Sequence, residues 1–62
     1  MNAPTLPLAA LEQVYDRLAC AIDEAGPDRS ELFLTKLALL CANALADAAL
    51  FEAQVAAALK DL

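Results

Sequence analysis

Hydrophobic residues recur every three or four positions along most of the chain, which is the spacing of one face of an α-helix. The first such segment covers residues 8–25, where Pro7 suits the first turn, Thr5 is a candidate cap and Gly26-Pro27 predicts the end. Its apolar stripe, which we expect to form a packing seam, consists of Leu8, Leu11, Tyr15, Leu18, Ile22 and Ala25.

A second helix is predicted over residues 28–45. Asp28 or Ser30 can cap its first turn, and Glu31 follows Asp28 by three positions, as in a capping box. Its apolar side chains fill a broad arc, which is typical of a central helix with two neighbours. We expect Phe33 and the thiol of Cys41 to be buried in this arc.

Four residues of this helix lie outside the arc on a stripe of their own. Leu32 and Leu39 share that stripe with Lys36 and Asn43, on the side that would otherwise face solvent. Two large apolar residues on a solvent-facing side of a helix indicate a further packing surface. We therefore predict that Leu32, Lys36, Leu39 and Asn43 belong to an interface.

A third, shorter amphipathic helix is predicted over residues 48–61, with Phe51 and Val55 on its packed face. No glycine or proline separates it from the second helix, so two topologies remain open. One is a three-helix unit with a turn near Ala46. The other is a helical hairpin with a long second arm.

The run LALLCANALADAALF, residues 37–51, holds only two strongly polar side chains. Asp47 is a good N-cap for the third helix, because its carboxylate can accept the free amide of Ala49 or Leu50. Asn43 could donate to Asp47 or to a carbonyl at the end of the second helix. The pair therefore favours a turn near Ala46 over a ligand site.

The chain resembles a family of short uncharacterised bacterial all-helical proteins, a domain of unknown function. The resemblance rests on the Leu-Ala-rich pattern of residues 33–50, which ends in Ala-Asn…Asp, and on residues 11–18 before it. The family usually has glycine where this chain has Ala46. Some members are encoded beside enzymes of aromatic-compound breakdown, including oxidoreductases. The resemblance therefore implies a role as an accessory subunit of such an oxidoreductase.

Composition limits the chemistry that the chain can perform. Histidine is absent, and the single serine, Ser30, therefore has no histidine base to activate it. Cys20 lies among acidic residues, where we expect a slow nucleophile, and its distance in sequence from Cys41 matches no paired zinc-ligand spacing. We expect no catalytic residues, no metal and no cofactor.

Charge and hydrophobicity limit the partners. The net charge is −5 and the four basic residues are scattered, which disfavours nucleic acid and an anionic membrane. The most apolar window long enough to span a membrane, residues 32–51, contains Thr35, Lys36, Asn43 and Asp47, so we predict no transmembrane segment. The sparse cysteines and the absence of a leader-like start favour a cytoplasmic protein.

These observations predict a small all-α protein with a flexible arm over residues 1–7 and one helical domain over residues 8–62. A chain of 62 residues that is 61% hydrophobic has more apolar surface than its own small core can bury. We therefore expect a non-enzymatic interaction protein that self-associates as a homodimer or higher oligomer. The alternative is an accessory subunit that docks on a larger enzyme.

Overall fold

Three α-helices account for most of the protein in the computed structural model, which describes residues 5–62. They are α1 (Leu8–Ala25), α2 (Ser30–Leu45) and α3 (Ala48–Leu59), and no strand occurs within these described residues. The predicted all-α, three-helix fold is confirmed. The second helix starts two residues later than predicted and the third ends two residues earlier.

The turn between α1 and α2 is centred on the carbonyl of Gly26. Gly26 has a φ of 83° and a ψ of 161°, a conformation open almost only to glycine, and its N–H donates to the Ile22 carbonyl at 3.1 Å. Its own carbonyl accepts the Arg29 N–H at 3.0 Å and the Ser30 hydroxyl at 2.8 Å. Gly26-Pro27 therefore ends α1, as predicted.

The predicted cap of α2 is wrong. Arg29 is the N-cap and makes no side-chain capping bond, so Asp28 does not cap the helix and no capping box forms. The reason is that residues 27–29 are used in the turn, which moves Asp28 away from the free amides of the first helical turn. Ser30 is already helical, and its hydroxyl bonds back to Gly26 instead.

The break between α2 and α3 excludes the long helical hairpin. Ala46 adopts the left-handed conformation, with φ 56° and ψ 33°, and its N–H donates to the Ala42 carbonyl at 3.1 Å. Asp47 is extended and caps α3, with its Oδ1 accepting the Leu50 N–H at 3.0 Å. The turn thus forms at Ala46, as in the first of the two predicted topologies.

The start of α1 needs no side-chain cap. Pro7 is its N-cap residue and accepts the Leu11 N–H on its carbonyl at 3.0 Å, while no side-chain bond caps the helix, so the expected cap at Thr5 is absent. Residues 5–7 are exposed and non-helical. The rest of the predicted N-terminal arm, residues 1–4, lies outside the described residues.

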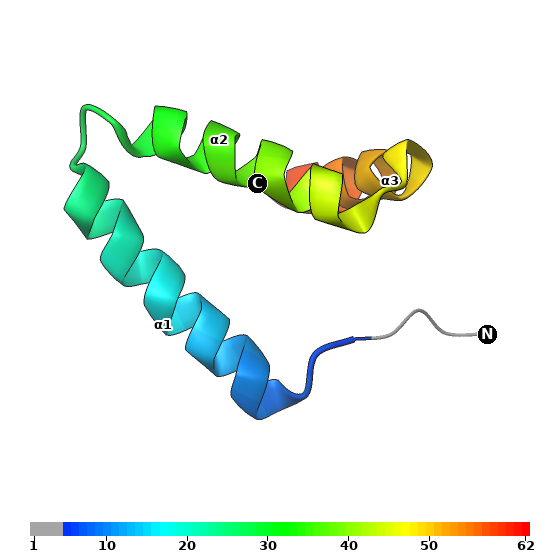
Figure 1. Ribbon diagram of the computed structural model, residues 1–62, viewed down its shortest axis with the longest axis horizontal. Coiled ribbons are helices and arrows are strands. Elements are labelled where there is room, and N and C mark those ends of the chain that lie inside the picture. The colour runs from blue at the N-terminus through cyan, green and yellow to red at the C-terminus, as the bar shows by residue number, and fades with distance from the viewer. Residues whose placement is uncertain (1–4) are drawn as a thin grey trace.

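Helix α2 lies in the middle of an open arrangement. It packs against both α1 and α3, whereas α1 and α3 do not contact each other within the described chain. Figure 1 shows α1 and α2 diverging as a V from the turn at residues 26–29, with α3 folded back behind the far end of α2. The radius of gyration is 13.0 Å, against about 10.6 Å for a compact chain of this length.

The V encloses no core of its own. None of the residues that the structure describes is buried. Phe33 and Phe51, expected in the core, are half-buried, and Cys41 is exposed rather than buried. The cause is geometric: two diverging helices and a third on another side of α2 leave every apolar side chain with at least one face in solvent.

Candidate interaction surface

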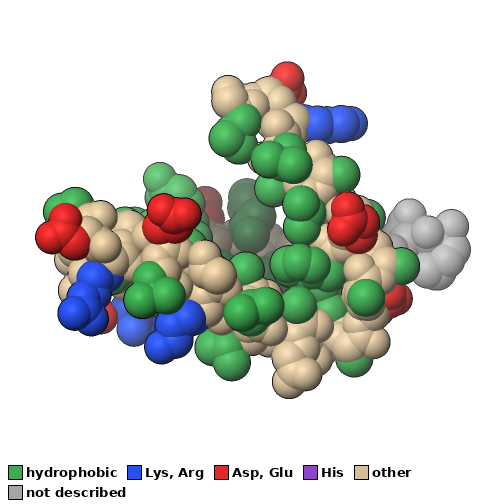
Figure 2. Space-filling model, turned by 90° about the horizontal axis from the view of Figure 1, so that it is seen from above, with side chains coloured by type: hydrophobic (Ala, Val, Ile, Leu, Met, Phe, Trp, Pro, Cys, Tyr) green, Lys and Arg blue, Asp and Glu red, His purple; other side chains and the backbone are tan. Residues whose placement is uncertain are grey.

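The stripe predicted to form an interface is open to solvent. Leu32 and Leu39 are 59% and 65% exposed, and Lys36 and Asn43 are exposed between and beyond them. Asn43 makes no side-chain hydrogen bond to the described residues, so its suggested bond to Asp47 or to a terminal carbonyl is absent. Hydrophobic side chains occupy much of the surface visible in Figure 2.

A groove of about 490 Å³ lies in the angle between α1 and α2. Phe33 and Leu37 of α2 form one wall, and α1 forms the other. The α1 side chains that line it are Ala10, Gln13, Val14, Arg17, Leu18 and Ala21. The groove is therefore mainly apolar, with one cation and no carboxylate among its lining residues.

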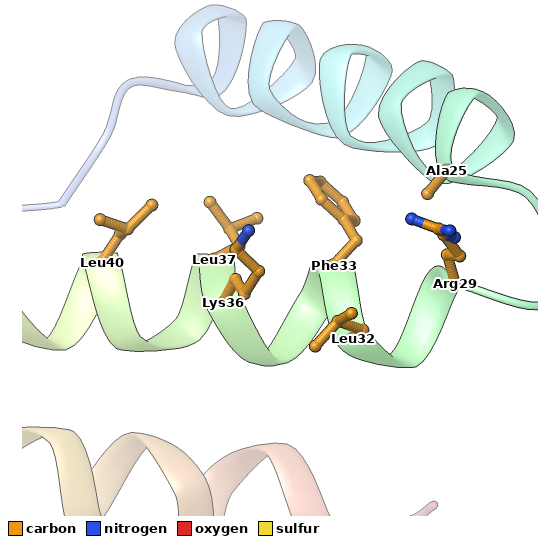
Figure 3. A pocket seen from close by; sticks show the side chains of 7 residues that line it. All are labelled: Ala25, Arg29, Leu32, Phe33, Lys36, Leu37 and Leu40. Carbon is orange, nitrogen blue, oxygen red and sulfur yellow. The ribbon is translucent and has the colours of Figure 1, made fainter.

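A second hollow of about 290 Å³ continues along α2, and Figure 3 shows its lining. Phe33, Leu37 and Leu40 point from α2 towards α1, with Leu40 beyond the part of α2 that α1 covers. Arg29 and Lys36 lie beside them, and again no acidic residue contributes. Leu32 and Lys36 belong to this hollow and to the predicted stripe, so the two surfaces are continuous.

The apolar stripe of α1 is exposed along its first half and lines neither hollow. Tyr15 is 71% exposed and Leu8 is 72% exposed, with Leu11 between them also exposed, which corrects their prediction as part of a packed seam. The half-buried residues in the second half of α1, the helix that packs against α2, are Leu18, Ala21, Ile22 and Ala25. The first two turns of α1 therefore present an unpartnered apolar surface.

Sequence reasoning identified Leu32 and Lys36 but missed Arg29, Leu40 and the α1 stripe as exposed surface. Leu40 was missed because it falls on the arc assigned to the core, and periodicity alone cannot show where a neighbouring helix ends. The gathering of basic residues at the two hollows has no signal in the sequence, where Asp16 precedes Arg17 and Asp28 precedes Arg29. Three of the four cations line the two hollows, while the acidic residues lie elsewhere.

Other chemistry is sparse in residues 5–62. No group of three His, Cys, Asp or Glu side chains is placed to hold a metal ion there. Cys20 and Cys41 are exposed free thiols. The Arg17 guanidinium lies 3.5 Å from the Glu24 carboxylate, an exposed pair that adds little stability. None of the described helices combines the length and the apolar character needed to cross a membrane.

The chain exposes more surface than a compact monomer of its mass. The chain exposes 5625 Å², whereas a compact monomer of the same mass would expose about 3,800 Å². The difference is about 1,800 Å² per chain, and the exposed large side chains are mostly leucines. Large contiguous patches of exposed apolar surface are typical of interaction sites.

Comparison with protein-family models, with curated proteins and with solved structures gave no match to this chain. The family resemblance therefore stays a prediction. The functional argument rests on the chain's own residues.

Proposed function

We propose that the protein is a non-enzymatic, cytoplasmic interaction protein that self-associates through the apolar face of α2. The observation that carries the proposal is the absence of any buried residue in the described chain. A folded protein of this size gains its stability from burying apolar area, and here that area can be buried only against another molecule. A second copy of the chain is a partner that is present wherever the chain itself is present.

The contact is assigned to the stripe of Leu32, Lys36, Leu39 and Asn43. Leu39 is the best-exposed apolar residue of this stripe, and it lies on α2, the helix that both other helices contact. The stripe contains no carboxylate, so two copies can approach here despite a net charge of −5 on each chain. Lys36 can snorkel its ammonium to the rim of such a contact.

Sedimentation equilibrium over a wide concentration range, with helicity recorded on the same samples, tests the proposal. We expect a multimer of the wild-type chain, and dissociation or unfolding when Leu39→Lys places a charge in the contact. Ala53→Lys is the matched control, because Ala53 is exposed and lies on the side of α3 opposite Phe51 and Val55.

A helical monomer at every concentration would overturn the proposal. It would favour the accessory-subunit alternative, in which the same face docks on a larger enzyme. An unchanged mass and unchanged melting of Leu39→Lys would remove the α2 stripe from the contact.

A further inference from the structure

We propose that the groove between α1 and α2 receives α1 of a second copy, so that two V-shaped chains interlock into a core of four helices. This inference rests on the proposed self-association and adds a second contact beside the α2 stripe. Leu32 and Lys36 of that stripe also line the second hollow, whereas Leu39 and Asn43 lie outside both hollows. By symmetry the contact forms twice, because each chain supplies one groove and one inserted helix. The inserted surface is the exposed stripe of Leu8, Leu11 and Tyr15.

The uncovered area matches what such an assembly needs. Obligate homodimers bury roughly 2,000–5,000 Å² in total, or about 1,000–2,500 Å² per chain. The excess of about 1,800 Å² over a compact monomer falls inside that range. One partner copy is therefore enough to bring this chain to the burial of an ordinary folded domain.

The two surfaces also match in length and spacing. The first and last members of the row Leu8, Leu11 and Tyr15 are seven positions apart on α1, and those of the row Phe33, Leu37 and Leu40 are seven positions apart on α2. At 1.5 Å per residue, each row is about 10.5 Å long. Rows of three side chains at spacings of three and four residues interdigitate when helices pack side by side.

The charges around the two hollows are complementary to those on α1 of a second copy. Arg17, Arg29 and Lys36 line the two hollows, and no acidic residue does. On α1, Glu12 follows Leu11 and Asp16 follows Tyr15, so carboxylates border the stripe that would enter. Within the described residues neither Glu12 nor Asp16 forms an ion pair, and the same is true of Arg29 and Lys36. Insertion therefore brings the carboxylates of Glu12 and Asp16 of one copy close to the cations Arg29 and Lys36 of the other.

Charge reversal on both sides tests the pairing. The variant Glu12→Lys/Asp16→Lys carries a basic stripe, and Arg29→Glu/Lys36→Glu carries an acidic rim. Each variant alone should self-associate on the order of tenfold more weakly than wild type, because like charges meet in both halves of its dimer. An equimolar mixture should form a heterodimer, because opposite charges then meet in both halves.

The readout is sedimentation equilibrium, with native mass spectrometry to distinguish the heterodimer and circular dichroism to verify that each variant stays helical. Asp23→Lys/Glu52→Lys is the control for Glu12→Lys/Asp16→Lys, with the same change in net charge at exposed positions outside both surfaces. It should associate at least as tightly as wild type. Recovery of dimerisation only in the mixture supports the inserted α1.

Two outcomes would overturn the inference and differ in what else they overturn. If the wild-type chain is a monomer at all concentrations, self-association itself fails. If wild type is a dimer and both charge-reversed variants dimerise as tightly as the control, self-association stands and the copies meet elsewhere. If one variant self-associates more weakly than wild type but the mixture forms no heterodimer, the proposed pairing of α1 with the groove is also overturned.

Discussion

Asp47 Oδ1 accepts a hydrogen bond from the backbone N–H of Leu50, with 3.0 Å between the oxygen and the nitrogen. This bond satisfies one of the free amides at the start of α3, and it stands directly after the left-handed residue Ala46. The two adjacent residues together turn what could have been one long helix into α2 and α3.

Replacing Asp47 with alanine should lower the free energy of unfolding by about 1 kcal/mol, because the Leu50 amide loses its acceptor. Urea denaturation followed by circular dichroism measures the change. Asp47→Ser is the matched control and should retain most of the stability, since serine caps helices about as well. Equal losses in both variants would contradict the capping role.

Replacing Ala46 with glycine should stabilise the protein by about 1 kcal/mol. Ala46 has a φ of 56°, and the left-handed conformation costs residues other than glycine roughly 1–2 kcal/mol. Ala44→Gly is the control: Ala44 is inside α2, where glycine should instead cost about 1 kcal/mol. Loss of stability in both variants would show that the chain does not turn at Ala46.

Replacing Gly26 with alanine should destabilise the turn between α1 and α2 by about 1–3 kcal/mol. Apart from Gly26 and its two chain neighbours, no heavy atom lies within 4 Å of the position where the new Cβ would stand, so the cost comes from the φ of 83° and not from a clash. The chain is short enough for chemical synthesis, and D-alanine at the same position, which favours positive φ, should restore most of the loss. Equal losses with both forms of alanine would point to a steric cause.

The fluorescence of Tyr15 should report the inserted helix. The chain has one tyrosine and no tryptophan, so the signal comes from a single side chain. Tyr15 is 71% exposed in the single chain and would be covered by a partner copy. Acrylamide should therefore quench it more strongly as dilution dissociates the protein. Constant quenching across the dissociation range, measured by sedimentation on the same samples, would place Tyr15 outside the contact.

The positions of the helices were predictable because the signals that set them are local. Gly26-Pro27 ends α1 through backbone geometry, and Asp47 caps α3 through an acceptor three residues from its donor. The false cap at Asp28 shows the limit of such signals. Whether a residue caps depends on where the turn before it ends, and here the turn takes in residues 27–29.

The candidate surface was predictable only in part. Leu32 and Leu39 were identified because they conflict with the apolar arc of their own helix, and both are exposed. Tyr15 and Cys41 were misplaced, because periodicity shows that a helix has an apolar face and does not show whether a neighbour covers it. The groove depends on residues from α1 and α2 together and has no signature in either segment alone.

The amino-acid sequence by itself determined that this protein is all-helical, where its helices lie to within about two residues at each end, and that its apolar surface exceeds what it can bury. These properties follow from backbone conformation, capping and residue counts, which act over a few positions. The tertiary structure decided which face of α1 meets α2 and left Leu8, Leu11 and Tyr15 uncovered. Neighbouring apolar faces of α1 satisfy the same helical spacing, and only the angle imposed by the turn at Gly26 to Arg29 selects between them.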